Sequence, residues 1–530
     1  MLELYSKLLK QKLTLSCLFS AFIVSTLCFF FFPRWETNDD VFMSMIAHGF
    51  GAMEKGSPNL FFSNVLWGYI VRAIPSIGGV LGYSIATLLA VFLGVWSIVY
   101  FLLYLNVGYL CAFLIGSLIS IRPILFPQFT ITAGLLSVAS LIGFYVCFKN
   151  ESKVLLIVSF ILLFLAYLIR KEELILIFGV GIPLIFVSFI RCRKFQKPFL
   201  LLLLIAIPSI EMIDRFSYQD QNWTYVKDFL KGIGPIVNSG KGAVLKKESQ
   251  LLKEFQFSVN DISLVENWFF GDPEIVAPRK LINMLSAIRQ DNSLSIKWGL
   301  DALRGLKKMN PLFGLSVILF FVFLNLRLSI MWAMLVLSVF ALGSIGAYDH
   351  ARVFIPIQFL AVIGPFCFSN FKKNPKQHYL VIFILFWATG AEFIKYRNDS
   401  LYFKKRIIEI KKDSSKLPRE AFLNWGAALP VEDLYHVLSN DIEVRKLSLI
   451  SLGWGTWFPN SLSKRLFESS TNLKSLLMSE QGVALVAFDK EIPLLATYCQ
   501  ERLNRSLIIL QETKTNFFTI RKVRCGNPVN

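Results

Sequence analysis

The first 394 residues of the chain alternate long apolar segments with short charged turns. Each apolar segment is about 17 to 25 residues long, which is the length an α-helix needs to cross the hydrocarbon core of a bilayer. A chain with 55% hydrophobic residues can keep so many such segments only in a membrane. We therefore predict an α-helical polytopic membrane protein with about eleven transmembrane helices. They are expected at residues 13–32, 81–104, 106–121, 128–148, 153–169, 174–190, 198–213, 311–326, 328–346, 353–370 and 378–394.

The first apolar segment sets the orientation of the chain. Residues 13–32 follow Lys7, Lys10 and Lys12, are too long for the core of a signal peptide, and lack a small-residue cleavage site. We interpret this segment as an uncleaved signal anchor with its N-terminus in the cytoplasm. Every turn on the cytoplasmic side then carries basic residues, as the positive-inside rule requires.

Residues 59–77 are apolar but are not counted as a span. They contain Arg72, Pro75 and a pair of glycines. Counting them would reverse the orientation of every later helix and would place the basic clusters at 191–194 and 371–376 outside the cell. We therefore predict a juxtamembrane helix that lies at the membrane interface.

This topology places three soluble segments on the outer face: an acidic loop at 33–58, a large loop at 214–310, and the C-terminal part. The large loop is rich in aromatic residues and is expected to fold over the outer mouth of the membrane domain. The C-terminal part alternates short apolar runs with helix-like polar stretches, which favours a small α/β or α+β domain. The expected domains are therefore a membrane domain at 1–394 and an extracytoplasmic domain at 395–530.

The formal charge of +19 is partly an orientation signal, because much of it lies in the short cytoplasmic turns. Nucleic acid is therefore not an expected partner, whereas the lipid bilayer is. Six of the eight cysteines lie in or beside apolar spans. The other two, Cys499 and Cys525, fall in the outward domain, where they either stay reduced or form a disulfide. No CxxC or HExxH metal spacing occurs in the sequence.

Two adjacent acidic residues, Asp39 and Asp40, follow the first span and begin an amphipathic stretch. One interpretation is that they only stabilise the N-terminus of a helix, with Asn38 or Asp39 as its N-cap. The alternative is that one carboxylate caps the helix while the other points into a cavity as a general base or a metal ligand. We favour Asp40 as the inward residue by a small margin.

Basic residues at the outer ends of later spans are candidates for binding a lipid phosphate. Arg352 begins a span beside His350, and a guanidinium grips phosphate oxygens in two places. The simpler interpretation is an interfacial arginine paired with Asp349. Arg170 and Glu173 lie in a short charged turn that either caps a helical hairpin in water or faces the same cavity.

Arg122 and Gln128 flank a proline-containing turn at the outer start of the fourth span. Polar groups at the start of a span are usually interfacial, but these two are also candidates for contacts to an acceptor or a donor. Together with Glu173 they complete the set of predicted site residues.

The order of these motifs resembles that of the GT-C superfamily of integral-membrane glycosyltransferases, which includes protein O-mannosyltransferases and the lipid A aminoarabinose transferase. The matching pieces are "NDD" at 38–40, the segment at 59–77, "RPILFPQFTIT" at 122–132 and "RVFIP" at 352–356. The likeness covers residues 1–394. Within the superfamily, the chain resembles GT-C-like proteins of bacterial envelope polysaccharide pathways.

The resemblance implies transfer of a hexose or pentose from a polyprenyl-phosphate-linked donor to a glycan, lipid or protein acceptor on the outer face. It also implies that Asp39 or Asp40 activates the acceptor and that Arg352 holds the donor phosphate. Family members often carry a second carboxylate at the outer start of the fourth span, where this chain has Gln128 instead. We therefore expect chemistry without a metal, although a divalent metal stays an alternative, and no cofactor is predicted with certainty.

Other functions remain open from the sequence. A polymerase or ligase that uses a whole lipid-linked oligosaccharide would need the same motifs. A transporter or flippase for a lipid-linked glycan predicts charges in the middle of spans, but here the charges gather at span ends. The expected location is the bacterial inner membrane. The alternative is the endoplasmic reticulum, where the sequon at Asn222 would face the lumen.

Overall fold

The computed structural model describes residues 2–288, 295–309, 311–346, 351–368, 375–469 and 472–527. The chain forms two compact units, each assembled from three separate stretches of sequence. Unit 1 consists of Met1–Asp40, Leu60–Asp214 and Ser293–Lys405. Unit 2 consists of Val41–Asn59, Arg215–Asn292 and Arg406–Asn530.

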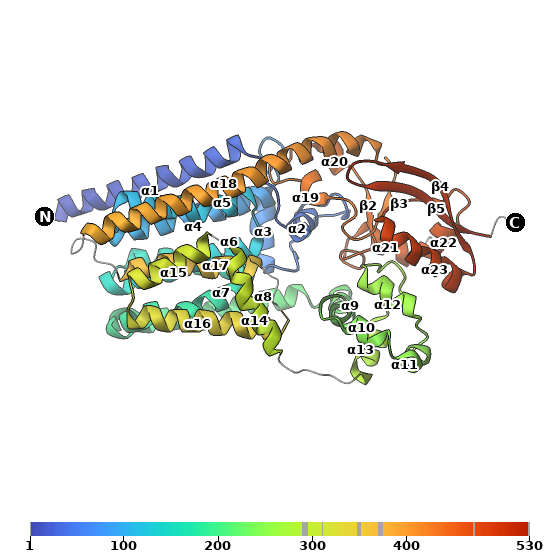
Figure 1. Ribbon diagram of the computed structural model, residues 1–530, viewed down its shortest axis with the longest axis horizontal. Helices are drawn as coiled ribbons and strands as arrows, with labels where there is room; N and C mark the ends of the chain where they lie inside the picture. The colour runs from blue at the N-terminus through green and yellow to red at the C-terminus, as the bar shows by residue number, and fades with distance from the viewer. Residues whose placement is uncertain are drawn as a thin grey trace. The chain divides into compact units, whose positions relative to one another are not determined.

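Unit 1 is a bundle of long apolar helices (Figure 1). Every segment predicted to span the membrane is helical in the structure. The helices are α1 (Leu2–Phe30), α4 (Gly82–Tyr104), α5 (Tyr109–Leu125), α6 (Phe129–Asn150), α7 (Lys153–Arg191), α8 (Arg193–Ser217), α15 (Leu312–Val322), α16 (Leu326–Ser344), α17 (Ala351–Ile363) and α18 (Pro375–Asp413). The short helices α3 (Val65–Ala73) and α14 (Ile296–Gly305) also belong to this unit.

The lengths of these helices identify an integral membrane protein. Among the described residues, 6 helices are long and apolar enough to cross a membrane: α1, α4, α6, α7, α16 and α18. Helix α7 covers two predicted spans. They are two helices that meet at Arg170, where the backbone leaves the helical conformation. Three further predicted spans are shorter apolar helices, α5, α15 and α17 extended to Cys367. The predicted span at 198–213 lies in α8, which is in neither group.

Helix α3 contains 9 residues and is too short to cross a bilayer at 1.5 Å per residue. Asn64 caps its N-terminus by accepting a hydrogen bond from Leu66 N. Its outward-facing side chains include Tyr69, which is 58% exposed. A short helix with one apolar face exposed agrees with exclusion of 59–77 from the spans.

The ends of the unit 1 helices contact one another as the predicted alternating topology requires. At the ends expected on the outer face, Asn64 N donates to Leu168 O at 2.8 Å. At the ends expected in the cytoplasm, Lys12 Nζ donates to Leu103 O at 2.8 Å, and Tyr145 Oη donates to Cys367 O at 2.7 Å. Residues predicted on the same side of the membrane therefore lie at the same end of the bundle.

Unit 2 is built on a five-stranded sheet in the order β2-β1-β3-β5-β4. The strands are β1 (Phe422–Asn424), β2 (Leu449–Ser451), β3 (Val483–Val486), β4 (Ser506–Lys514) and β5 (Thr519–Gly526). Strand β1 pairs in parallel with both β2 and β3, and the β3–β5 and β5–β4 pairs are antiparallel. This mixed sheet with helices confirms the prediction of a small α/β or α+β domain.

Of the outer loop predicted at 214–310, the described residues 215–288 fold together with this sheet, whereas α14 belongs to unit 1. The helices of 215–288 include α9 (Gln221–Asn238), α12 (Val259–Glu266) and α13 (Pro278–Ala287). Phe229 and Phe269 share one apolar core with Leu423 and Tyr498 of the C-terminal part. Whether this unit covers the mouth of the membrane domain stays a prediction.

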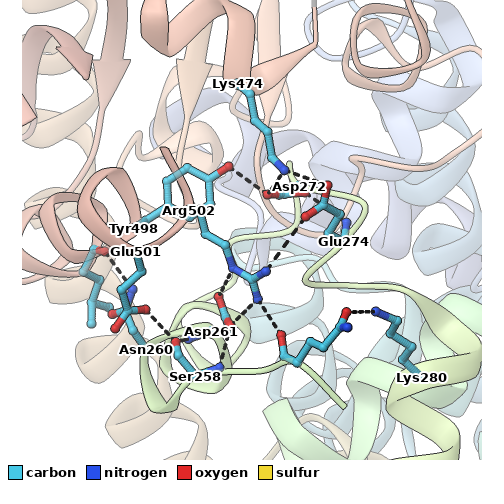
Figure 2. Close-up of polar contacts among 12 residues, drawn as sticks. Ser258, Asn260, Asp261, Asp272, Glu274, Lys280, Lys474, Tyr498, Glu501 and Arg502 are labelled. Atoms are coloured by element: carbon cyan, nitrogen blue, oxygen red, sulfur yellow. Dashed lines mark hydrogen bonds and ion pairs between the residues drawn. The ribbon is translucent and has the colours of Figure 1, made fainter. Parts of the chain in front are cut away.

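A polar network also ties the two parts of unit 2 together (Figure 2). Arg502 Nε donates to Asp261 Oδ1 at 3.2 Å, and Tyr498 Oη donates to Asp272 Oδ2 at 2.8 Å. Lys474 Nζ lies 2.8 Å from Glu274 Oε1. Because each buried carboxylate in this network has a partner, the network serves to stabilise the unit.

Cys499 and Cys525 form a disulfide, which settles the alternative left open by the sequence. The bond joins α23 (Ile492–Leu503) to β5 inside unit 2. Helix α18 runs without interruption through residue 394, where the sequence suggests a domain boundary, and the two units divide at Lys405.

Candidate functional site

The acidic segment after α1 is fastened to the turn between α5 and α6. Arg34 N donates to Leu125 O at 3.0 Å, and Glu36 N donates to Pro127 O at 3.2 Å. The side chain of Glu36 forms an ion pair with Arg122 at the end of α5. These bonds hold the start of α2 (Asn38–His48) in a defined place in unit 1.

Asp40 is completely buried, with no exposed surface. Its carboxylate accepts hydrogen bonds from Tyr83 Oη at 3.0 Å, from Phe129 N at 3.1 Å and from Thr37 Oγ1 at 3.3 Å. Burial raises the pKa of this carboxyl well above its ordinary range, and the charge of Asp39 raises it further. Asp40 therefore links the first turn of α2 to the first turns of α4 and α6.

Asp39 faces in a different direction and forms an ion pair with Arg352. The distance from Arg352 Nη1 to Asp39 Oδ2 is 2.9 Å. The Asp39 side chain is 23% exposed and that of Arg352 is 31% exposed, so both groups remain open to solutes. The structure thus brings together two predicted site residues that are 313 positions apart in the sequence.

Arg170 lies beside this ion pair, and its guanidinium interacts electrostatically with both Arg352 and Asp39. Its backbone adopts φ −159° and ψ 101°, an extended conformation that interrupts α7 and lets the side chain leave the helix axis. The guanidinium lies 5.0 Å from the centre of the Phe129 ring. Since Phe129 N also donates to Asp40, one residue positions both charged groups.

Gln128 and Glu173 are both buried. Gln128 is the N-cap of α6, because its Oε1 accepts hydrogen bonds from Thr130 N and Ile131 N. Its Nε2 has no hydrogen-bond partner among the described residues. Glu173 packs against Gly134 of α6, and its Oε1 also has no partner within the described chain. Both side chains keep unused hydrogen-bonding capacity at the outer start of α6.

Arg122 is already engaged inside unit 1. Besides Glu36 it contacts Tyr396 of α18, donating to the hydroxyl group and lying 5.3 Å from the centre of the ring. Its predicted contact with a substrate is untested, and its observed contacts fasten the acidic segment. His350 lies outside the described residues, as does its neighbour Asp349.

Sequence analysis missed the residues that hold the acidic pair in place, chiefly Tyr83, Phe129 and Tyr396. Tyr83 and Phe129 lie in the first turns of α4 and α6, where aromatic residues in membrane proteins are common, whereas Tyr396 lies within α18. The positions of Tyr83 and Phe129 at the start of predicted spans gave a signal, but that signal does not name Asp40 as the partner.

The arrangement gathers two guanidinium groups and one partly exposed carboxylate at the starts of α2 and α17 and at the break within α7. Such a cluster can bind an anion with the two cations and accept a proton with the carboxylate. Within the described residues, no group of three or more His, Cys, Asp or Glu side chains comes together as a metal site. Chemistry without a metal stays a prediction.

Comparisons with known proteins add one likeness. No family model matches the chain, and no curated protein matches it. Among solved structures, the chain is similar to the crystal structure of ArnT from Cupriavidus metallidurans bound to undecaprenyl phosphate. The two chains are 12% identical with a TM-score of 0.36, over 98% of this chain and 97% of that chain.

At this identity and TM-score the likeness carries no inference about family, substrate or mechanism.

Proposed function

We propose that this chain is a membrane glycosyltransferase that moves a sugar from a polyprenyl-phosphate-linked donor to an acceptor on the outer face of the membrane. The observation that carries the proposal is the ion pair between Asp39 and Arg352, with Arg170 beside it. Such a transfer needs two groups within a few ångströms of each other. One is a cation that binds the donor phosphate, and the other is a carboxylate that accepts the proton of the acceptor.

The two arginines suit the phosphate of a lipid. Arg352 is the second residue of the apolar helix α17, and Arg170 interrupts the apolar helix α7. A lipid whose tail lies along these helices would bring its phosphate to the level of both guanidinium groups. The phosphate would compete with Asp39 for Arg352 and would thereby release the carboxylate.

The transfer follows from these positions. An acceptor hydroxyl attacks the anomeric carbon of the sugar, and the bond between that carbon and the phosphate oxygen breaks. The electron pair leaves with the polyprenyl phosphate, whose charge Arg352 and Arg170 stabilise. The proton of the hydroxyl passes to the carboxylate of Asp39.

Asp39 is the better candidate for the base, and Asp40 for a positioning residue. Asp39 is partly exposed, whereas Asp40 has no exposed surface and accepts three hydrogen bonds from the protein. A buried carboxyl that ties three helix ends together cannot reach an acceptor without losing those bonds. This assignment reverses the marginal preference for Asp40 drawn from the sequence.

The acceptor is proposed to be a cell-envelope glycan, with the enzyme in the bacterial inner membrane and its C-terminal domain outside the cytoplasm. This part rests on the distribution of basic residues and on the motif resemblance. A lipid or a protein acceptor would use the same carboxylate. Analysis of surface glycans in a strain that lacks the gene distinguishes these acceptors.

Binding of undecaprenyl phosphate tests the phosphate site without knowledge of the sugar. The purified chain in lipid nanodiscs is titrated with this lipid, and binding is followed by native mass spectrometry. We expect Arg352→Ala and Arg170→Ala each to weaken binding about 10- to 100-fold, since a charge-assisted hydrogen bond contributes about 1.5 to 3 kcal/mol.

Arg327→Ala is the matched control, because Arg327 lies at the other end of the bundle, 5.6 Å from the centre of the Phe368 ring. Its binding should equal that of the unaltered chain. If all three variants bind undecaprenyl phosphate as tightly as the unaltered chain does, the assignment of the phosphate site is overturned.

A further inference from the structure

A second site is indicated at the carboxyl edge of the parallel strands in unit 2. Strand β1 lies between β2 and β3, so the chain leaves β1 to one side and later returns to the other. In open α/β sheets this reversal of strand order opens a crevice at the carboxyl ends of the strands, where ligands bind. Binding groups are therefore expected among the residues that follow β1, β2 and β3.

Several segments converge at this edge. The Cα of Gly426, after β1, lies 3.7 Å from the position that a Cβ on Gly453, after β2, would occupy. The carbonyl oxygen of Trp268 lies 3.6 Å from that same position. A Cβ on Gly426 would stand 3.8 Å from Trp268 Cβ and 4.0 Å from Glu491 Oε1. Two glycines thus let the segments after β1 and β2 lie in van der Waals contact with each other and with Trp268 at this edge.

The edge carries buried polar side chains that can accept further hydrogen bonds. Asn424 is the last residue of β1 and is 8% exposed. Its Oδ1 has no hydrogen-bond partner among the described residues, and its Nδ2 donates to Gly426 O at 3.4 Å. Glu491 is 3% exposed, and its Oε2 accepts a hydrogen bond from Phe488 N at 2.9 Å. A buried acceptor without a partner costs about 1 to 3 kcal/mol, which a ligand hydroxyl would recover.

Two tryptophans flank these groups. The rings of Trp268 and Trp454 are half-buried, and their centroids are 6.5 Å apart with an interplanar angle of 69°. Trp268 adopts φ 63° because it follows the C-cap of α12: its N–H donates to Val265 O at 3.0 Å, and Phe269 N donates to Leu264 O at 2.9 Å, which ends the helix.

We propose that this edge of unit 2, consisting of Trp268, Asn424, Gly426, Trp454 and Glu491, binds a saccharide. Tryptophan rings offer flat apolar faces for the C–H face of a sugar ring, and the amide and carboxyl oxygens accept bonds from its hydroxyls. Because Glu491 is acidic and Asn424 offers an acceptor, the edge disfavours a phosphate. The proposal does not rest on the assignment of a transferase site in unit 1.

Saturation-transfer NMR on the full chain tests the proposal. The protein is placed in nanodiscs, because detergents with sugar headgroups would compete. The probes are trisaccharides of glucose, galactose, mannose and N-acetylglucosamine, with inorganic phosphate as an anionic probe. We expect at least one trisaccharide to receive saturation, while phosphate receives none.

Two variants are chosen to remove binding without unfolding the unit. Asn424→Leu keeps the volume of the side chain and deletes an acceptor that no protein group uses. Trp268→Gly removes one ring and suits the left-handed backbone, but that ring also packs against the core of unit 2, so this variant is expected to be less stable. Each should weaken binding at least tenfold, while the melting temperature of Asn424→Leu stays within about 3 °C.

Glu480→Gln, an exposed acid in the same unit, and Trp298→Ala, a 42% exposed tryptophan in unit 1, are the matched controls and should bind as the unaltered chain does. Absence of saturation for all four trisaccharides overturns the proposal. So does binding that Asn424→Leu and Trp268→Gly leave unchanged, and so does stronger saturation of phosphate than of any sugar.

Discussion

At the scale of single residues, three acids follow the first apolar helix, and each is bound by a different part of unit 1. Glu36 pairs with Arg122, Asp39 with Arg352, and Asp40 with Tyr83 and Phe129 N. Two of the three therefore fix the backbone in place. Asp39 and Glu36 are equally exposed, at 23%, but Arg352 is 31% exposed against 15% for Arg122 and has Arg170 beside it, which is why the proposed chemistry is assigned to Asp39.

Asp40→Asn and Asp40→Ala separate a positioning role from a catalytic one. An asparagine can keep its Oδ1 on Tyr83 and Phe129 N, so we expect a folded protein with most of its transfer activity. Alanine leaves both donors buried without an acceptor, and we expect a loss of stability of about 2 to 4 kcal/mol. Thermal unfolding in nanodiscs and sugar incorporation into surface glycans measure the two effects.

A folded Asp40→Asn protein without any activity would assign the base to Asp40 instead. That result would match the preference from the sequence, in which the two adjacent acids could not be told apart. Their roles depend on which one meets the first turns of α4 and α6, and those turns lie tens of residues away in the chain. The pairing with Arg352, in contrast, was within reach of sequence reasoning, because charge placement puts both residues at the same membrane face.

At the scale of elements, the site depends on close packing of α6 against α17. Gly134 of α6 faces Pro356 of α17, and a Cβ at this glycine would overlap the proline ring. Small residues commonly allow membrane helices to approach in this way. Arg352 stands one turn before Pro356, so the position of α17 determines where its guanidinium lies.

Gly134→Ala should therefore displace α17 and weaken binding of undecaprenyl phosphate at least tenfold. Gly179→Ala in α7 is the matched control, since a Cβ there meets nothing within 4 Å. It should bind as before and gain about 0.5 to 1 kcal/mol of stability from the better helix former. Equal effects of the two substitutions would show that the α6–α17 contact does not position the site.

The positions of the helices follow from the length of the apolar runs, and the structure confirms them. The turn predicted at "RKEE" is present as well, because two helices meet at Arg170, and Glu151 and Lys194, which flank the two ends of α7, lie 3.9 Å apart. In contrast, the residues of 215–292 show helical patterns but give no sign that Phe229 and Phe269 share a core with the C-terminal strands. Contacts between distant segments are decided by packing that no local pattern records.

At the scale of the whole molecule, the chain consists of two units with their own cores, and a pH effect is expected in one of them. Burial raises the pKa of Glu491 in unit 2 from 4.5 to about 7. The folded unit therefore holds this proton more tightly than the unfolded chain does. The stability that Glu491 contributes to unit 2 is fully present below pH 4.5 and is lost as the pH rises through about 7, by about 3 kcal/mol at most.

Hydrogen exchange followed by mass spectrometry measures this effect locally. Between pH 5 and 8, after correction for intrinsic exchange rates, amides of β1 and β3 should lose protection, and Glu491→Gln should abolish that loss. Amides of helices α4 and α6 in unit 1 serve as an internal reference, because their protection should be the same with and without the substitution at Glu491. A pH dependence in β1 and β3 that persists in Glu491→Gln would contradict the role of this carboxyl.

The central claim, that Asp39 is the base of a sugar transfer, is tested most directly by the surface glycans of a strain that lacks the gene. The strain is complemented with the unaltered chain, with Asp39→Asn, or with Asp228→Asn, an exposed acid paired with Lys231. At matched protein levels, mass spectrometry should find the transferred sugar with the unaltered chain and with Asp228→Asn. With Asp39→Asn it should fall about 10²- to 10⁴-fold. Undiminished transfer in Asp39→Asn would contradict the claim.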